Sequence, residues 1–136
     1  MNITIKGHES CICKGQPRRI TITDKTISLI ECTWQDRIDI KHSIERDPEK
    51  PITIEYGRSN DDKPYTLITI FGEGITTDRD PALLRIQYWD HNPDELFCWM
   101  IGPGKYRRAE TCSEIFRMDD NGHAQRRKII ALAEQQ

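Results

Sequence analysis

The residues best suited to chemistry are a histidine and two cysteines near the start of the chain. His8, Cys11 and Cys13 lie in the segment HESCIC. In an extended segment the two cysteines point to the same side, so two thiolates and an imidazole are offered to a zinc ion, with Cys32 or His42 as the fourth ligand. Structural zinc sites use pairs spaced C-x₂₋₄-C, and the chain has no second pair. We therefore expect ordinary buried thiols here, with no metal and no cofactor.

Carboxylates in turns are the second group of residues that could bind a metal or take part in catalysis. Six of them lie in three successive connections, at Asp61 and Asp62, Asp78 and Asp80, and Asp90 and Asp94. Several carboxylates at one end of a barrel can hold a hard cation, but none shows the spacing of a calcium loop, and Asp is a favoured turn residue. The G-x-S-x-G, P-loop, G-x-G-x-x-G and H-E-x-x-H motifs are all absent. The sequence therefore favours a protein without catalysis, with a metal-dependent hydrolase built on these carboxylates or on the Cys/His cluster as an alternative.

Basic residues gather in the last third of the chain. They are Lys105, Arg107 and Arg108, which flank Tyr106, and then Arg126, Arg127 and Lys128. Cations near the start of a helix are disfavoured by its dipole, which indicates an anionic neighbour, either the acidic loops of residues 61–94 or a partner. The net charge is −2 and no stripe alternates basic with aromatic residues, so nucleic acid is a less favoured partner than protein.

Length and composition are those of a single domain spanning residues 1–136. Charged residues make up 31% and hydrophobic residues 36% of the chain. The opening residues lack the apolar run of a secretory signal, and no segment approaches the roughly 20 apolar residues that cross a membrane. Five cysteines in no framework spacing then predict reduced thiols and a cytoplasmic location.

Short alternating segments predict strands along most of the chain, to about residue 118. The clearest is 52–56, which we expect to form a hairpin with 64–71. A second hairpin joins 84–88 to 95–101 through a type I turn at residues 92–95, with Pro93 in its second position. The polar stretch 41–51 is interpreted as a loop. This pattern predicts an all-β fold, mainly an antiparallel β-barrel or sandwich.

One helix is predicted at about 121–134. Ile129, Leu132 and Ala133 fall on one face, and a short helix persists only if such a face is buried. The strand 95–101 is apolar on both sides, from Leu96 to Ile101. We therefore expect the helix to dock on the sheet over the second apolar face of that strand.

The order of strands followed by a terminal helix resembles that of small calycin-type barrels, although the Gly-x-Trp of classical lipocalins is missing, because Cys32-Thr33 precedes Trp34. The resemblance implies a small molecule bound in a cavity lined by Tyr56, Phe71, Tyr88 and Trp99, which is our second hypothesis. The leading hypothesis is a non-catalytic protein-binding module of inhibitor, immunity or adaptor type. It acts through a charge-complementary surface that is rich in aromatic and arginine side chains. The residues expected to form that surface are Trp89, Tyr106, Arg107, Arg108, Arg126 and Arg127.

Overall fold

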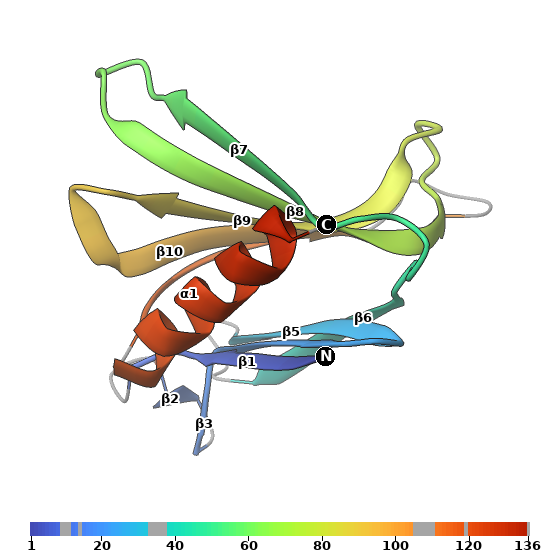
Figure 1. The fold of residues 1–136 in the computed structure, drawn as a ribbon. Helices are drawn as coiled ribbons and strands as arrows, with labels where there is room; N and C mark the ends of the chain where they lie inside the picture. Colours follow the sequence, from blue (N-terminus) through green and yellow to red (C-terminus); the bar gives the residue numbers. More distant parts are fainter. Residues whose placement is uncertain (9–11, 14, 33–37, 105–110, 119, 136) are drawn as a thin grey trace.

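The computed structural model describes residues 1–8, 12–13, 15–32, 38–104, 111–118 and 120–135. It is mostly antiparallel β structure with one C-terminal helix, which confirms the predicted fold class (Figure 1). The strands are β1 (Asn2–Lys6), β2 (Ile12–Cys13), β3 (Gln16–Pro17), β4 (Arg19–Thr23), β5 (Thr26–Cys32), β6 (Asp39–Glu45), β7 (Thr53–Arg58), β8 (Pro64–Ile75), β9 (Pro81–Trp89), β10 (Asn92–Ile101) and β11 (Thr111–Arg117), and the helix is α1 (Asp120–Glu134). No helix in this described part is long and apolar enough to cross a membrane.

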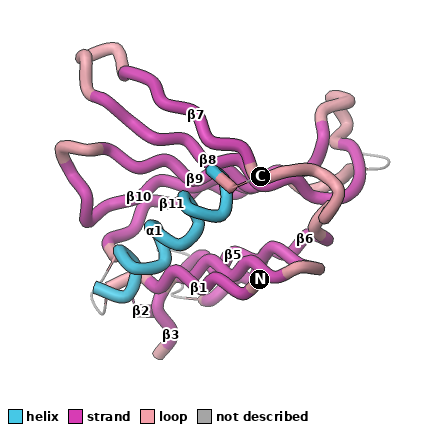
Figure 2. The backbone as a smooth tube through the Cα atoms, viewed as in Figure 1, coloured by secondary structure: helices cyan, strands magenta, loops and turns pink. Residues whose placement is uncertain are grey.

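Two sheets face each other. The first has the order β1-β4-β5-β6, the second has the order β11-β10-β9-β8-β7, and β2 pairs with β3 in a small third sheet. The predicted hairpin of 52–56 with 64–71 is confirmed, because β7 pairs antiparallel with β8. Figure 2 shows the two large sheets as separate layers with the helix along one side. The layers approach at two corners through isolated bridges, Gly7 with Met118 and Arg46 with Gly72, and do not close into one continuous sheet.

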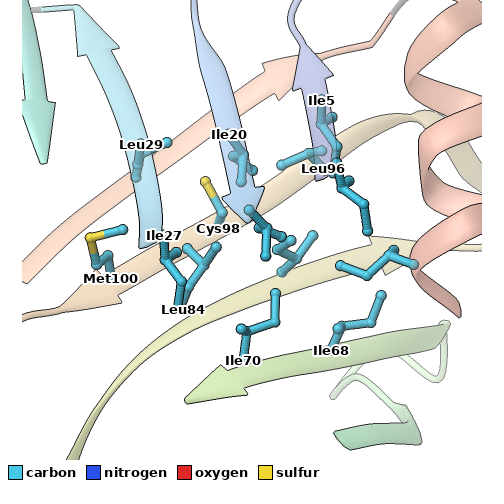
Figure 3. Packing of buried hydrophobic residues seen from close by; sticks show 14 of the residues in the cluster. Ile5, Ile20, Ile27, Leu29, Ile68, Ile70, Leu84, Leu96, Cys98 and Met100 are labelled. Carbon is cyan, nitrogen blue, oxygen red and sulfur yellow. The ribbon is translucent and has the colours of Figure 1, made fainter. Parts of the chain in front are cut away.

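The core lies between the two sheets. Alternation places one set of side chains from each strand in this layer, because successive residues of a strand point to opposite faces. In Figure 3, side chains of both sheets point toward one another, among them Ile20 and Leu29 from the first sheet and Ile70, Leu84 and Met100 from the second. All five are buried. The isoleucine-rich alternation seen in the sequence therefore forms a continuous apolar layer.

Two local predictions are wrong. The stretch expected to be a loop begins inside a strand, because β6 includes residues 41–45 and pairs along its whole length with β5. The turn between β9 and β10 lies at Asp90 and His91, not at 92–95: Trp89 pairs with Asn92, and a bulge follows before Leu96. In both segments the hydrogen bonds to a neighbouring strand outweigh a weak local preference, that of a polar stretch for a loop and that of an Asn-Pro pair for a turn.

The predicted helix is confirmed, but its predicted location is wrong. Helix α1 packs against β1 and β7, along the side where the gap between the sheets would otherwise open (Figure 1). Ile129 and Ala133 are buried in the core cluster, and the Lys128 ammonium donates to the Asn2 carbonyl oxygen at 2.9 Å. The helix therefore adds to the inner layer and does not pack on the other face of β10.

The cysteines also differ in part from the prediction. Cys98 and Cys112 are free and buried. Cys32, at the end of β5, is disulfide-bonded. The expectation of five reduced thiols is therefore wrong at Cys32.

Candidate functional site

Three polar side chains meet at the margin of the layer between the sheets, where two of them, Glu31 and His42, are partly exposed. Glu31 lies on β5 and His42 on β6 of the first sheet, and Cys112 lies on β11 of the second. The strand registers explain the meeting. His42 pairs with the buried Leu29, and Cys112 pairs with the buried Met100, so both side chains point into the layer.

Glu31 connects the other two residues through one carboxylate oxygen. The Cys112 thiol donates to Glu31 Oε2 at 2.6 Å, and His42 Nε2 donates to the same oxygen at 2.7 Å. The three donor atoms all lie within 4.8 Å of one another. We call these three residues the Glu-His-Cys cluster.

The electrostatics of the cluster keep the thiol protonated. Burial raises the pKa of Cys112, and its hydrogen bond to Glu31 raises that pKa further. Glu114 lies two residues along β11, and burial raises the pKa of its carboxyl, although the Arg18 guanidinium at 3.2 Å opposes this shift. Since the reactive form of a cysteine is the thiolate, Cys112 is not an activated nucleophile in this arrangement.

A cavity of about 220 Å³ borders the cluster. It is smaller than the roughly 300–1,000 Å³ of pockets that hold drug-sized molecules, and suits water or a small ion. Its lining is Lys41, His42, Ser43, Ile44, Met100, Gly102 and Cys112.

The outer face of the second sheet is the other feature with functional potential. Outward positions align across β8, β9 and β10 in rows such as Leu67, Gln87 and Phe97, and Thr69, Arg85 and Trp99. We call this surface the outer aromatic face. Its side chains are those of Tyr65, Leu67, Thr69, Phe71, Leu83, Arg85, Gln87, Trp89, Phe97, Trp99 and Ile101, and all are partly exposed except Thr69 and Leu83, which are buried.

Arg85 is the only charged residue among those outward positions. Its guanidinium lies over the Trp99 ring, 5.9 Å from the ring centroid. The centroids of the Phe97 and Trp99 rings lie 5.3 Å apart. Arg85 Nε is buried and has no hydrogen-bond partner. The row beyond Phe97 ends at Ile115 on β11, which is 52% exposed. A cation held among rings in a neutral apolar surround is the composition found at the centre of protein interfaces.

The residues predicted to bind a partner are spread over different elements. Trp89 belongs to the outer aromatic face, where it pairs with Tyr65. Arg126 lies over the buried Tyr88 ring, 4.4 Å from its centroid, and so has an aromatic neighbour inside the molecule. Arg127 is exposed on the helix. Three further predicted residues lie outside the described part of the chain, namely Tyr106, Arg107 and Arg108.

The structure does not bring together the four residues predicted to line a ligand cavity. Tyr88 is fully buried between the sheets, whereas Phe71 and Trp99 lie on the outer aromatic face. Tyr56 is 68% exposed on β7, where its hydroxyl donates to Glu134 of the helix at 3.2 Å.

The chemistry-bearing residues of the sequence are also separated. Cys11 and the side chain of Cys13 lie outside the described residues, and His8 follows β1, where its amide donates to the Arg117 carbonyl oxygen. The turn at residues 76–80 lies at the far end of β8 from the turn at 59–63, so the acidic turns do not share one end of the sheet (Figure 1).

Sequence reasoning missed the Glu-His-Cys cluster as a unit. A signal for it exists in β5, because Glu31 continues the inward parity of Ile27 and Leu29. The signal in β6 is hidden, because the polar stretch 41–51 has the local composition of a loop. The approach of β11 from the other sheet leaves no local pattern at all.

No protein family, curated protein or solved structure gives a significant match to this chain. Its function must therefore be argued from its own residues.

Proposed function

We propose that this protein is a non-catalytic protein-binding module of inhibitor, immunity or adaptor type, and that it binds its partner through the outer aromatic face. The observation that carries the proposal is the position of α1. Because the helix packs against β1 and β7, it does not cover the rings of Phe97 and Trp99, which are partly exposed on the other side of β10.

The chemistry of the face defines the partner. On the outward positions of β8, β9 and β10, neutral and apolar side chains surround the Arg85 guanidinium. Two other charged groups lie at the edge of the face, where Glu55 pairs with Leu67 and the Lys50 ammonium lies over the Phe71 ring. A partner surface with apolar side chains around one carboxylate matches this pattern, since the carboxylate pairs with Arg85 and the rings lose their contact with water. A protein surface can provide both the apolar side chains and the carboxylate across the three strands of the outer aromatic face.

The location of the protein belongs to the same proposal. The sequence predicts the cytoplasm, but the disulfide at Cys32 favours an oxidising compartment, where such bonds persist. Both locations are compatible with the outer aromatic face as the binding surface.

Site-specific photo-crosslinking tests the proposal. A photoreactive residue at Gln87 lies within the face, and one at Ser28 lies on the outward side of the first sheet as a control. Each is combined with Arg85→Glu or with the matched reversal Arg58→Glu, at an exposed arginine on β7. In extract of the native source, we expect a crosslinked partner from position 87 and none from position 28. The crosslink from position 87 should be lost in Arg85→Glu and kept in Arg58→Glu.

The size of the effect follows from the central position of Arg85. Removing a hot-spot side chain costs about 2 kcal/mol or more, which is roughly 30-fold in affinity. Crosslinking of equal strength from both sheets, or equal strength in both arginine variants, would overturn the proposal. A product of twice the chain mass would show that a second copy of this chain occupies the face, and not a different protein.

A further inference from the structure

The proposed binding of a protein partner does not explain why the three side chains of the Glu-His-Cys cluster meet. We infer that Glu31, His42 and Cys112 form a binding site for one Zn²⁺ ion, with the fourth coordination position facing the adjoining cavity. The inference stands apart from the proposed function, because the outer aromatic face lies on the opposite side of the second sheet.

The donor types select the metal. A thiolate, an imidazole nitrogen and a carboxylate oxygen are the three ligand classes that proteins offer to zinc. Calcium and magnesium take oxygen ligands almost exclusively, so a site with Cys112 and His42 disfavours them. The remaining donor, Glu31, is already in contact with both of its neighbours.

The distances fit a tetrahedral ion after small side-chain movements. Zinc bonds of about 2.0–2.3 Å in a tetrahedron place neighbouring donors roughly 3.3–3.8 Å apart. The contacts of Glu31 Oε2 with His42 Nε2 and Cys112 Sγ, now 2.7 and 2.6 Å, must therefore lengthen by about 1 Å. The third pair, His42 Nε2 with Cys112 Sγ, lies within 4.8 Å and so needs to shorten by at most about 1.2 Å.

Charge and protons balance when the ion binds. The Cys112 thiol releases its proton to solvent as the bond from sulfur to zinc forms. His42 loses to solvent the Nε2 proton that it donates to Glu31 and takes one up on Nδ1, so that the neutral imidazole binds the ion through Nε2. Glu31 exchanges its two hydrogen bonds for one metal bond. One dication then compensates the thiolate and the carboxylate in a layer where burial penalises uncompensated charge.

The cavity supplies the fourth ligand. His42 and Cys112 form part of its wall, together with Lys41, Ser43 and Met100. Its volume of about 220 Å³ is several times the roughly 30 Å³ that one water occupies in the liquid. A water molecule or a small anion can therefore reach the ion from the cavity and complete the tetrahedron.

Cobalt substitution tests the site directly. Co²⁺ in a tetrahedral site with a thiolate gives a sulfur-to-metal charge-transfer band and strong visible absorption, which the free ion lacks. The folded protein, under non-reducing conditions, is titrated with Co²⁺ and then with Zn²⁺. We expect one Co²⁺ per chain, the charge-transfer band, and loss of that band when one equivalent of Zn²⁺ displaces the cobalt.

Variants assign the signal to these residues. Cys112→Ser keeps a hydroxyl donor toward Glu31 but removes the sulfur, so the charge-transfer band should vanish. His42→Gln, at a partly exposed position, should weaken binding by at least about a hundredfold, since even the outer-shell partners of ligands contribute about 10- to 100-fold. Circular dichroism of each variant confirms that it folds.

The matched control is His8→Gln, which removes the histidine of the segment HESCIC. It should leave both the band and the affinity unchanged. Absence of the band in the folded wild-type protein would overturn the inference, as would a band that survives in both Cys112→Ser and His42→Gln. A band lost only in His8→Gln would place the metal at the N-terminal segment and equally overturn it.

Discussion

Replacing Ile129 with alanine tests where helix α1 packs. Ile129 is fully buried in the core cluster, and the helix that carries it packs against β1. The matched replacement is Ile115→Ala, which removes the same atoms from the outer side of β11, where the isoleucine is 52% exposed. If the helix covered the outer face instead, the row that ends at Ile115 would lie beneath it.

The expected cost follows from the burial of the two side chains. Isoleucine to alanine removes three carbon atoms, worth about 0.8 kcal/mol each when fully buried, or about 2.4 kcal/mol. The cavity left behind raises the cost, and measured values for such core truncations run from about 2 to 5 kcal/mol. We expect about 3 kcal/mol for Ile129→Ala and within about 0.5 kcal/mol for Ile115→Ala.

Denaturant unfolding of the two variants and the wild type measures these costs. A loss of about 3 kcal/mol also lowers the thermal midpoint by roughly 10 °C in a domain of this size. A double-mutant cycle adds a positional test: Ile129→Ala with Ile3→Val, on β1, should show a coupling of about 0.5 kcal/mol or more, whereas Ile129→Ala with Ile115→Ala should be additive. Equal costs at positions 129 and 115, or coupling only between those two, would refute the packing described above.

Three further predictions concern other parts of the molecule. A hydrogen bond with the Glu45 carboxyl raises the pKa of Glu73, so the folded state favours protonated Glu73 and loses stability as the pH rises through that pKa. Melting curves should therefore show that the thermal midpoint of Glu73→Gln rises relative to that of the wild type from acid to neutral pH. A difference between the two midpoints that is independent of pH would contradict this. Gly72→Ala should cost about 1–3 kcal/mol of stability, because its Cβ would come 2.9 Å from the Glu45 carbonyl oxygen. Gly102→Ala should cost much less, because the atom nearest to its Cβ would lie at 3.5 Å. Similar unfolding midpoints of the two variants would argue against this. Alkylation followed by mass spectrometry should label Cys32 only after reduction, and labelling of the denatured, unreduced chain would disprove the disulfide.

The alternation of apolar and polar residues determined most of the secondary structure. Residues 19–23 and 64–71 carry side chains whose parity alone decides which face is buried, because a strand repeats every two residues. The C-terminal helix was also determined locally, by an apolar stripe with no breaker after Gly122. These signals act over a few residues, which is the range over which a sequence pattern can be interpreted without a structure.

The candidate sites depend on contacts between distant residues. Glu31 and Cys112 lie 81 positions apart and belong to different sheets. Their meeting requires the pairing of β11 with β10 and the stacking of the two sheets, and neither has a local signature. For the same reason the cysteines that the sequence suggests as candidate zinc ligands, and at which it predicts no metal, are those of HESCIC, which are neighbours along the chain.

The sequence by itself determined that strand 95–101 is apolar on both faces, and that a helix with one apolar face follows. Only the tertiary structure decided which surface that helix covers. The gap between the sheets at β1 and β7 offers Ile129 burial on several sides, whereas the outer face of a sheet offers burial on one side only. Because the free energy of burial grows with the area removed from water, the helix occupies the gap and does not pack on the outer aromatic face.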